Sequence, residues 1–211
     1  GTLMADLLRA TARVPGFHAG LSLHLVETSP RLRAAQALRL PGATWHDSPA
    51  TLPGGPLFLV ANEFLDALPI RQFTRRGGGW AETVVGLQGG RLVPGLTAPV
   101  PLAALAHRLD DTRDGDVVET CAPATALVAA LGARIAAQGG AALIVDYGGG
   151  PSLGDTFQAM AGHRPVDPFA APGQADLTAH VDFVALAGAA APARVSPVTP
   201  QGRFLNRLDI G

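Results

Sequence analysis

The stretch LFLVANEFLDALPI, residues 57–70, decides the fold. It opens as an apolar run with the length of a buried strand, and three polar side chains then follow within five positions: Asn62, Glu63 and Asp66. In open α/β sheets, ligands bind outside the carboxyl ends of the parallel strands, so these side chains are placed to meet a ligand. The alternative is a plain strand followed by an Asn cap and a solvated acidic turn; the rest of the chain favours the ligand site.

Apolar strands alternate with amphipathic helices from residue 1 to residue 145, which predicts a doubly wound, mostly parallel α/β sheet. The expected strands span 21–26, 43–47, 57–62, 117–119 and 141–145, and the expected helices span 2–13, 30–40, 102–109, 123–138 and 182–191. We expect residues 195–208 to add one or two closing strands. Because the sequence shows no boundary between two domains, we predict a single domain over residues 1–211.

Two segments depart from this alternation. Residues 70–95 contain three short strands punctuated by glycines, which predicts an antiparallel β-meander inserted after strand 57–62. Residues 148–182 are polar, aromatic and rich in turns, which predicts a covering loop on the substrate side. The histidines and aspartates of this loop lack the compact spacing of metal ligands, so we predict no metal site.

The composition limits the class of protein. The 211 residues are 47% hydrophobic and 16% charged, which suits one globular domain. A formal net charge of -1 argues against nucleic-acid binding. The single cysteine, Cys121, adjoins an apolar run and indicates a reducing compartment and a core position rather than a nucleophile. No apolar run reaches the ~20 residues of a membrane span, and no signal peptide is seen, so we predict a cytoplasmic protein. The basic residues are all Arg, a bias typical of a bacterial genome.

Cofactor residues are predicted at the start of the chain. Gly1 and Thr2 lead directly into the first helix, as the end of a nucleotide-binding loop does, so we expect the preceding strand and most of a Gly-rich loop to lie upstream. Glu27 follows strand 21–26. Its separation from Gly1 is close to the ~20 residues that lie between the Gly-rich loop of a dinucleotide-binding fold and the acidic residue that binds the ribose. A surface glutamate fits that spacing equally well. Asp47 and Ser48 follow the next strand and can bond an adenine edge, although a loop cap is the ordinary explanation.

Six motifs occur in order along the chain. They are VETSPRLRAAQ at 26–36, WHDS at 45–48, NEFLDALPIRQF at 62–73, IVDYG at 144–148, GDTFQA at 154–159 and DLTAHVDF at 176–183. Together they resemble the MidA family of S-adenosylmethionine-dependent methyltransferases, which includes the mitochondrial complex I assembly factor. The resemblance extends over essentially the whole chain.

The resemblance implies a class I methyltransferase fold, Rossmann-like, with S-adenosyl-L-methionine as cofactor. The mitochondrial member methylates an arginine of a complex I subunit, so the resemblance implies a protein arginine as acceptor. A guanidinium arrives charged and must be held by carboxylates, and Glu63 and Asp66 supply that pair. Asn62 orients the target nitrogen or holds the cofactor's amino group. Further candidates for the acceptor pocket are Asp146, Tyr147, His163 and His180.

Two other functions remain open at this point. One is a small-molecule methyltransferase with the same fold, and the other is a non-catalytic assembly factor that uses the fold as a binding surface. A homodimer is a further hypothesis.

Overall fold

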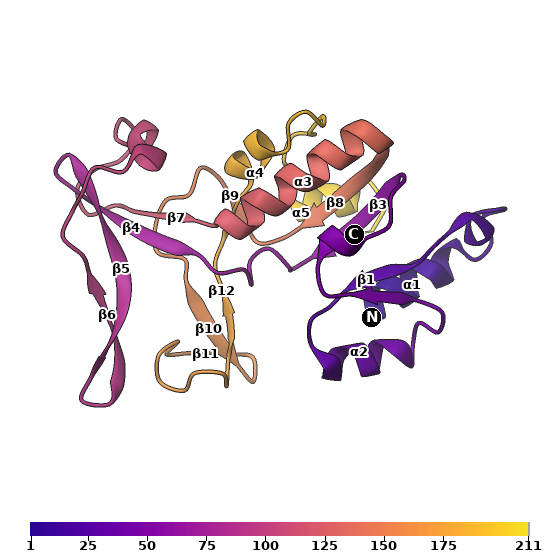
Figure 1. Ribbon diagram of the computed structural model, residues 1–211, viewed down its shortest axis with the longest axis horizontal. Coiled ribbons are helices and arrows are strands. Elements are labelled where there is room, and N and C mark those ends of the chain that lie inside the picture. The colour runs from indigo at the N-terminus through magenta and orange to yellow at the C-terminus, as the bar shows by residue number, and fades with distance from the viewer. Residues whose placement is uncertain (211) are drawn as a thin grey trace. The chain divides into compact units, whose positions relative to one another are not determined.

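The chain forms two compact units, Gly1–Gly55 and Pro56–Gly211, in a computed structural model that describes residues 1–210 (Figure 1). Among the described residues, none of the helices combines the length and the apolar character that crossing a membrane requires.

The first unit contains a parallel pair of strands, β1 (His24–Val26) and β2 (Thr44–His46), with His24 opposite Thr44. Its helices are α1 (Thr2–Thr11), α2 (Pro30–Ala37) and the short 3-10 turns η1 (His18–Gly20) and η2 (Pro49–Thr51). Helix α2 begins as the sequence predicts, because Ser29 Oγ accepts the N–H of Leu32 at 3.3 Å and Pro30 occupies the first turn.

The second unit is built on another parallel pair, β3 (Leu57–Asn62) and β8 (Gly140–Val145). Helix α3 (Ala122–Gln138) contacts both strands, and α4 (Phe183–Ala189) lies beside it (Figure 1). Their buried core consists of Leu65, Ala124, Val128, Val181, Leu186 and Ala190. The two helices approach closely at Gly132, where an added Cβ would lie 2.0 Å from the carbonyl oxygen of Ala190.

We expected β3 and β8 to be buried strands, but parts of them are open. Phe58 is 80% exposed and Leu143 is 44% exposed. In residues 1–210 each of these two strands is paired only with the other. Within the second unit, helix α3 packs against them.

The meander forms as predicted from β4 (Arg71–Arg76), β5 (Gly79–Gln88) and β6 (Arg91–Leu96), all antiparallel. The strand β7 (Val117–Thr120) joins it by pairing antiparallel with β4, so the strand order is β6-β5-β4-β7. A second core lies here, made of Phe73, Trp80, Leu105 and Val118, with Leu105 supplied by the 3-10 helix η3 (Ala103–Arg108).

Residues 148–182, hereafter the covering segment, contain five short strands. The strands β10 (Gln158–Ala161), β11 (Arg164–Val166) and β12 (Asp176–Thr178) form an antiparallel sheet in the order β11-β10-β12. The strands β9 (Gly148–Gly149) and β13 (Val181–Asp182) pair in parallel.

The prediction of closing strands over residues 195–208 is wrong. A short helix, α5 (Gln201–Asn206), lies there instead, and no strand is found in this part of the described chain. Pro197 and Pro200 lack the N–H that a strand donates to its neighbour, which disfavours a sheet.

Candidate functional site

The turn after β3 is held by the carboxylate of Asp146. Its Oδ2 atom accepts the backbone N–H groups of Phe64, Leu65 and Asp66 at 3.2, 2.9 and 3.3 Å, and its Oδ1 accepts the N–H of Tyr147 at 3.0 Å. Because β3 and β8 are parallel and in register, their carboxyl ends bring Asp146 to the start of this turn. Asp146 therefore positions the turn that carries Glu63 and Asp66, hereafter the acidic turn.

Glu63 lies at the first position of the turn. Its N–H donates to the carbonyl of Val145 at 2.9 Å, and its φ angle of 47° lies in the left-handed region that few non-glycine residues adopt. The side chain of Asn62 donates to Glu63 Oε1 at 3.4 Å. Both side chains therefore lie at the carboxyl end of β3.

Asp66 is the buried carboxylate of the turn, at 6% exposure. Its carbonyl accepts the N–H of Ala179 at 2.9 Å, which ties the turn to the covering segment. Burial raises the pKa of the Asp66 carboxyl above its ordinary value, and the nearby Asp146 and Glu63 carboxylates raise it further. Both effects disfavour the charged form of Asp66 unless a cation lies beside it.

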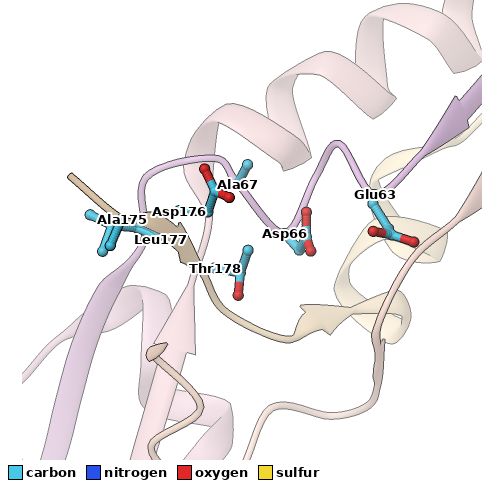
Figure 2. Close-up of a pocket in the computed structure, with 7 residues that line it drawn as sticks. All are labelled: Glu63, Asp66, Ala67, Ala175, Asp176, Leu177 and Thr178. Carbon is cyan, nitrogen blue, oxygen red and sulfur yellow. The ribbon is translucent and has the colours of Figure 1, made fainter. Parts of the chain in front are cut away.

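The turn and strand β12 face each other across a pocket of about 520 Å³ (Figure 2). This acidic pocket is lined by Glu63, Asp66, Ala67, Ala175, Asp176, Leu177 and Thr178. It holds three carboxylates, and within residues 1–210 none of the three forms an ion pair with a basic side chain. A cavity with this charge is suited to a cationic group.

Asp176 was not assigned to the site by sequence reasoning. It opens the motif DLTAHVDF, but its neighbours in the chain gave no sign that it lines the same pocket as Asp66. The pairing of β12 with β10, in which Asp176 lies opposite Met160, places it there.

A second unassigned residue, Glu119, holds the covering segment in place. This carboxylate is 5% exposed and accepts the N–H of Thr156 and the side-chain amide of Gln72, each at 2.9 Å, together with the hydroxyl of Thr156. The Thr156 hydroxyl in turn accepts the N–H of His180 at 2.8 Å. Glu119 thus holds Thr156 and, through it, His180, which is next to Ala179. The only feature of the sequence that indicates a role for Glu119 is its position at the end of a predicted strand.

The other candidates for the acceptor pocket lie elsewhere in this unit. Tyr147 is 63% exposed, and His163 has a φ of 62° in the turn between β10 and β11. His180 is exposed beyond Ala179. Neither these residues nor Asp146 lines the acidic pocket. No cluster of three or more His, Cys, Asp or Glu side chains in the described chain has the arrangement of a metal site.

Cys121 packs against the core of α3 and α4, as its sequence context predicts. Burial raises the pKa of its thiol, so the reactive thiolate is disfavoured at neutral pH.

In the first unit, Glu27 lies at the carboxyl end of β1 within a polar network. Its Oε1 accepts the N–H of Ser29 at 2.9 Å and its Oε2 accepts the side-chain amide of Gln36 at 3.2 Å. Gly1 lies close to the same glutamine, since a Cβ added to it would be 3.2 Å from Gln36 Cγ. The structure therefore brings Gly1 and Glu27 to one place, and Thr2 begins α1 beside them.

Asp47 and Ser48 follow β2 and already have partners. Asp47 forms an ion pair with Arg33, and its side chain is 83% exposed. The hydroxyl of Ser48 accepts the N–H of Ala50 at 3.2 Å and begins η2, so a loop cap accounts for this serine in the structure.

Glu27 and the beginning of α1 fit the chemistry of a nucleoside cofactor. The Glu27 carboxylate, at the end of a parallel strand, can accept hydrogen bonds from a ribose diol. The first N–H groups of α1 have no partners within the helix and favour a negatively charged group.

Comparison with solved structures defines the class. A protein from Burkholderia thailandensis with bound S-adenosyl-homocysteine superposes with a TM-score of 0.68 at 31% identity, covering 90% of this chain and 52% of that one. A native structure of a protein from the same organism gives 0.70 at 32% identity, covering 90% and 54%. The fold is therefore that of the class I S-adenosylmethionine-dependent methyltransferases, as the motifs implied.

Residues 1–200 match the sequence family described as "Putative S-adenosyl-L-methionine-dependent methyltransferase". The chain belongs to this family, which confirms the MidA resemblance and identifies S-adenosyl-L-methionine as the family's cofactor.

Curated relatives carry a more specific name. The chain is 36% identical over 241 residues to protein arginine methyltransferase NDUFAF7, mitochondrial, of Danio rerio, which covers 100% of this chain and 56% of the relative. The Homo sapiens protein of that name is 35% identical over 214 residues, covering 87% and 48%. The chain thus spans about half the length of the curated relatives it matches.

Proposed function

We propose that this chain carries the catalytic domain, one domain over residues 1–211, of an S-adenosyl-L-methionine-dependent methyltransferase whose acceptor is a protein arginine. The observation that carries the proposal is the acidic pocket, with Glu63, Asp66 and Asp176 around a cavity that has no cationic side chain among its lining residues. The relatives named protein arginine methyltransferase support the same acceptor.

A guanidinium group suits this pocket because it is planar, permanently charged and rich in N–H donors that bind carboxylates in pairs. Burial and the neighbouring carboxylates raise the pKa of Asp66, and an entering cation would oppose both effects by favouring the charged carboxylate. Glu63 and Asp66 would hold positive charge on the nitrogens that do not react, leaving the third free to attack. Asn62 would orient that nitrogen or hold the cofactor's amino group.

The cofactor, when bound, supplies an electrophilic methyl group for an in-line displacement, and the protein's task is chiefly alignment. We assign cofactor binding to Gly1, Thr2, Glu27, Asp47, Ser48 and Asn62. Asp146 acts by fixing the turn that carries the two acidic side chains. Tyr147, His163 and His180 remain candidates for contacts with a larger acceptor.

The test is methylation of arginine-containing proteins by the full-length enzyme carrying Glu63→Gln, Asp66→Asn or Asp176→Asn. Losing a charged hydrogen-bond partner costs at least about 2 kcal/mol, or roughly 30-fold in kcat/KM. Affinity for S-adenosylmethionine, measured by calorimetry, should be preserved. Asp110→Asn, at an exposed position outside the pocket, is the matched control. Full turnover in all three variants would refute the assigned roles.

The same assay separates the other functions. Labelling of a metabolite extract without any labelled protein would identify a small-molecule methyltransferase. Failure to bind the cofactor, together with a stable complex with a respiratory subunit, would identify a non-catalytic assembly factor.

Within this proposal, the MidA resemblance makes a complex I subunit the first acceptor to assay. We place the protein in a bacterial cytoplasm on the basis of its composition, with Arg as the only basic residue besides His and with a single Cys. We also propose a homodimer, to be tested by light scattering of the purified full-length protein.

A further inference from the structure

A second cavity, of about 230 Å³, lies in the same unit between the β5–β6 hairpin and the covering segment. Val85 and Leu92 line it from the hairpin, and Phe157 and Phe169 line it from the covering segment. The two phenylalanine rings lie 6.2 Å apart, centroid to centroid, and are tilted by 47°, a common arrangement of packed aromatic side chains. No charged residue lines this apolar pocket.

The apolar pocket adjoins the acidic pocket. Ala175 and Leu177 line both cavities, so β12 forms the partition between them. Leu177 is nonetheless 44% exposed and Val85 is 51% exposed, which leaves apolar surface available to an incoming group. The two cavities are therefore neighbours that share these two residues.

The size of the apolar pocket limits its occupant. Cavities for drug-sized ligands begin at about 300 Å³, and this cavity is smaller. It suits one aliphatic or aromatic side chain. An extended polypeptide advances ~3.3 Å per residue, so a side chain within about three residues of the arginine can reach across one strand.

We propose that the apolar pocket is a specificity subsite that binds an apolar side chain of the protein substrate close to the arginine held in the acidic pocket. This inference rests on the proposed function. The enzyme then recognises an arginine and a neighbouring apolar residue together, which disfavours arginines in wholly polar segments.

The test uses full-length enzyme and a set of arginine-centred peptides. Each flanking position, out to about three residues on either side, carries Leu or Asn in turn. At one position we expect Leu to raise kcat/KM about tenfold over Asn, which corresponds to about 1.4 kcal/mol of binding.

Val85→Asp should abolish that preference while the Asn peptides react as before. Val84→Asp is the matched control, because Val84 is 44% exposed on the same strand but points to the opposite face and does not line the pocket. Leu92→Asp provides a second variant, and cofactor calorimetry confirms that each variant folds.

Methylation of all peptides without a Leu preference, or a preference that survives Val85→Asp, would overturn the subsite while leaving the arginine acceptor intact. If the wild-type enzyme methylates no arginine peptide or protein, the proposed function fails and the subsite fails with it. Tight binding of a fluorescent fatty acid that Val85→Asp removes, with no peptide preference, would assign the pocket to a free lipid instead.

Discussion

Asp146 supports the acidic turn, and removing its carboxylate should destabilise the second unit. Asp146→Ala leaves the N–H groups of Phe64, Leu65 and Asp66 without their acceptor, together with that of Tyr147. Hydrogen bonds to a charged group contribute about 1.5–3 kcal/mol each, but the three on Oδ2 share one atom and the freed groups partly rehydrate. We therefore expect a loss of about 3 kcal/mol, or roughly 6–12 °C in Tm for a chain of this length.

The assay is thermal and urea unfolding followed by circular dichroism, on the wild-type protein and three variants. Asp146→Asn keeps one oxygen acceptor and should lose about half as much stability. Asp114→Ala, which removes a single acceptor for the N–H of Gly77 at an exposed turn, should cost about 1 kcal/mol or less. If Asp146→Ala costs no more than Asp114→Ala, the carboxylate does not hold the turn and its assigned role is refuted.

Two further predictions concern charge and packing. The pKa of Asp66 is raised in the folded chain, so its contribution to stability is present below the unfolded-state pKa and is lost as the pH rises through the folded-state pKa. Asp66→Asn should remove this pH dependence, as measured by urea unfolding at a series of pH values. Binding of an arginine peptide, which requires the carboxylate, should strengthen over the same rise in pH, and pH-independent binding would contradict the raised pKa. Gly132→Ala should destabilise the fold by about 1–3 kcal/mol, because its Cβ would lie 2.0 Å from the Ala190 carbonyl oxygen. Gly188→Ala is the control: a Cβ there meets nothing within 4 Å and should stabilise the helix by up to about 1 kcal/mol. Equal effects of the two substitutions in urea unfolding would argue against the close approach of α3 and α4.

Local sequence signals predicted most of the elements. The apolar run before Asn62 forms β3, the Ser29-Pro30 pair begins α2, and the glycines at 77–79 and 89–90 separate antiparallel strands. These signals depend on residues close together in the chain, such as a cap, a turn or a short alternation. The prediction at residues 195–208 fails for a local reason as well: the apolar residues there favour strands, but the prolines among them disfavour a sheet.

For the site, the sequence by itself determined that Asn62 ends a strand and that Glu63 and Asp66 follow it, and the motifs identified the family. Only the tertiary structure decided that Asp146, some 80 residues away, holds their turn, and that Asp176 lines the same pocket as Asp66. It likewise decided that β7 joins the meander sheet. The physical reason is that a buried carboxylate or a strand edge takes its partner from whichever segment the fold brings near, and sequence distance carries no record of that choice.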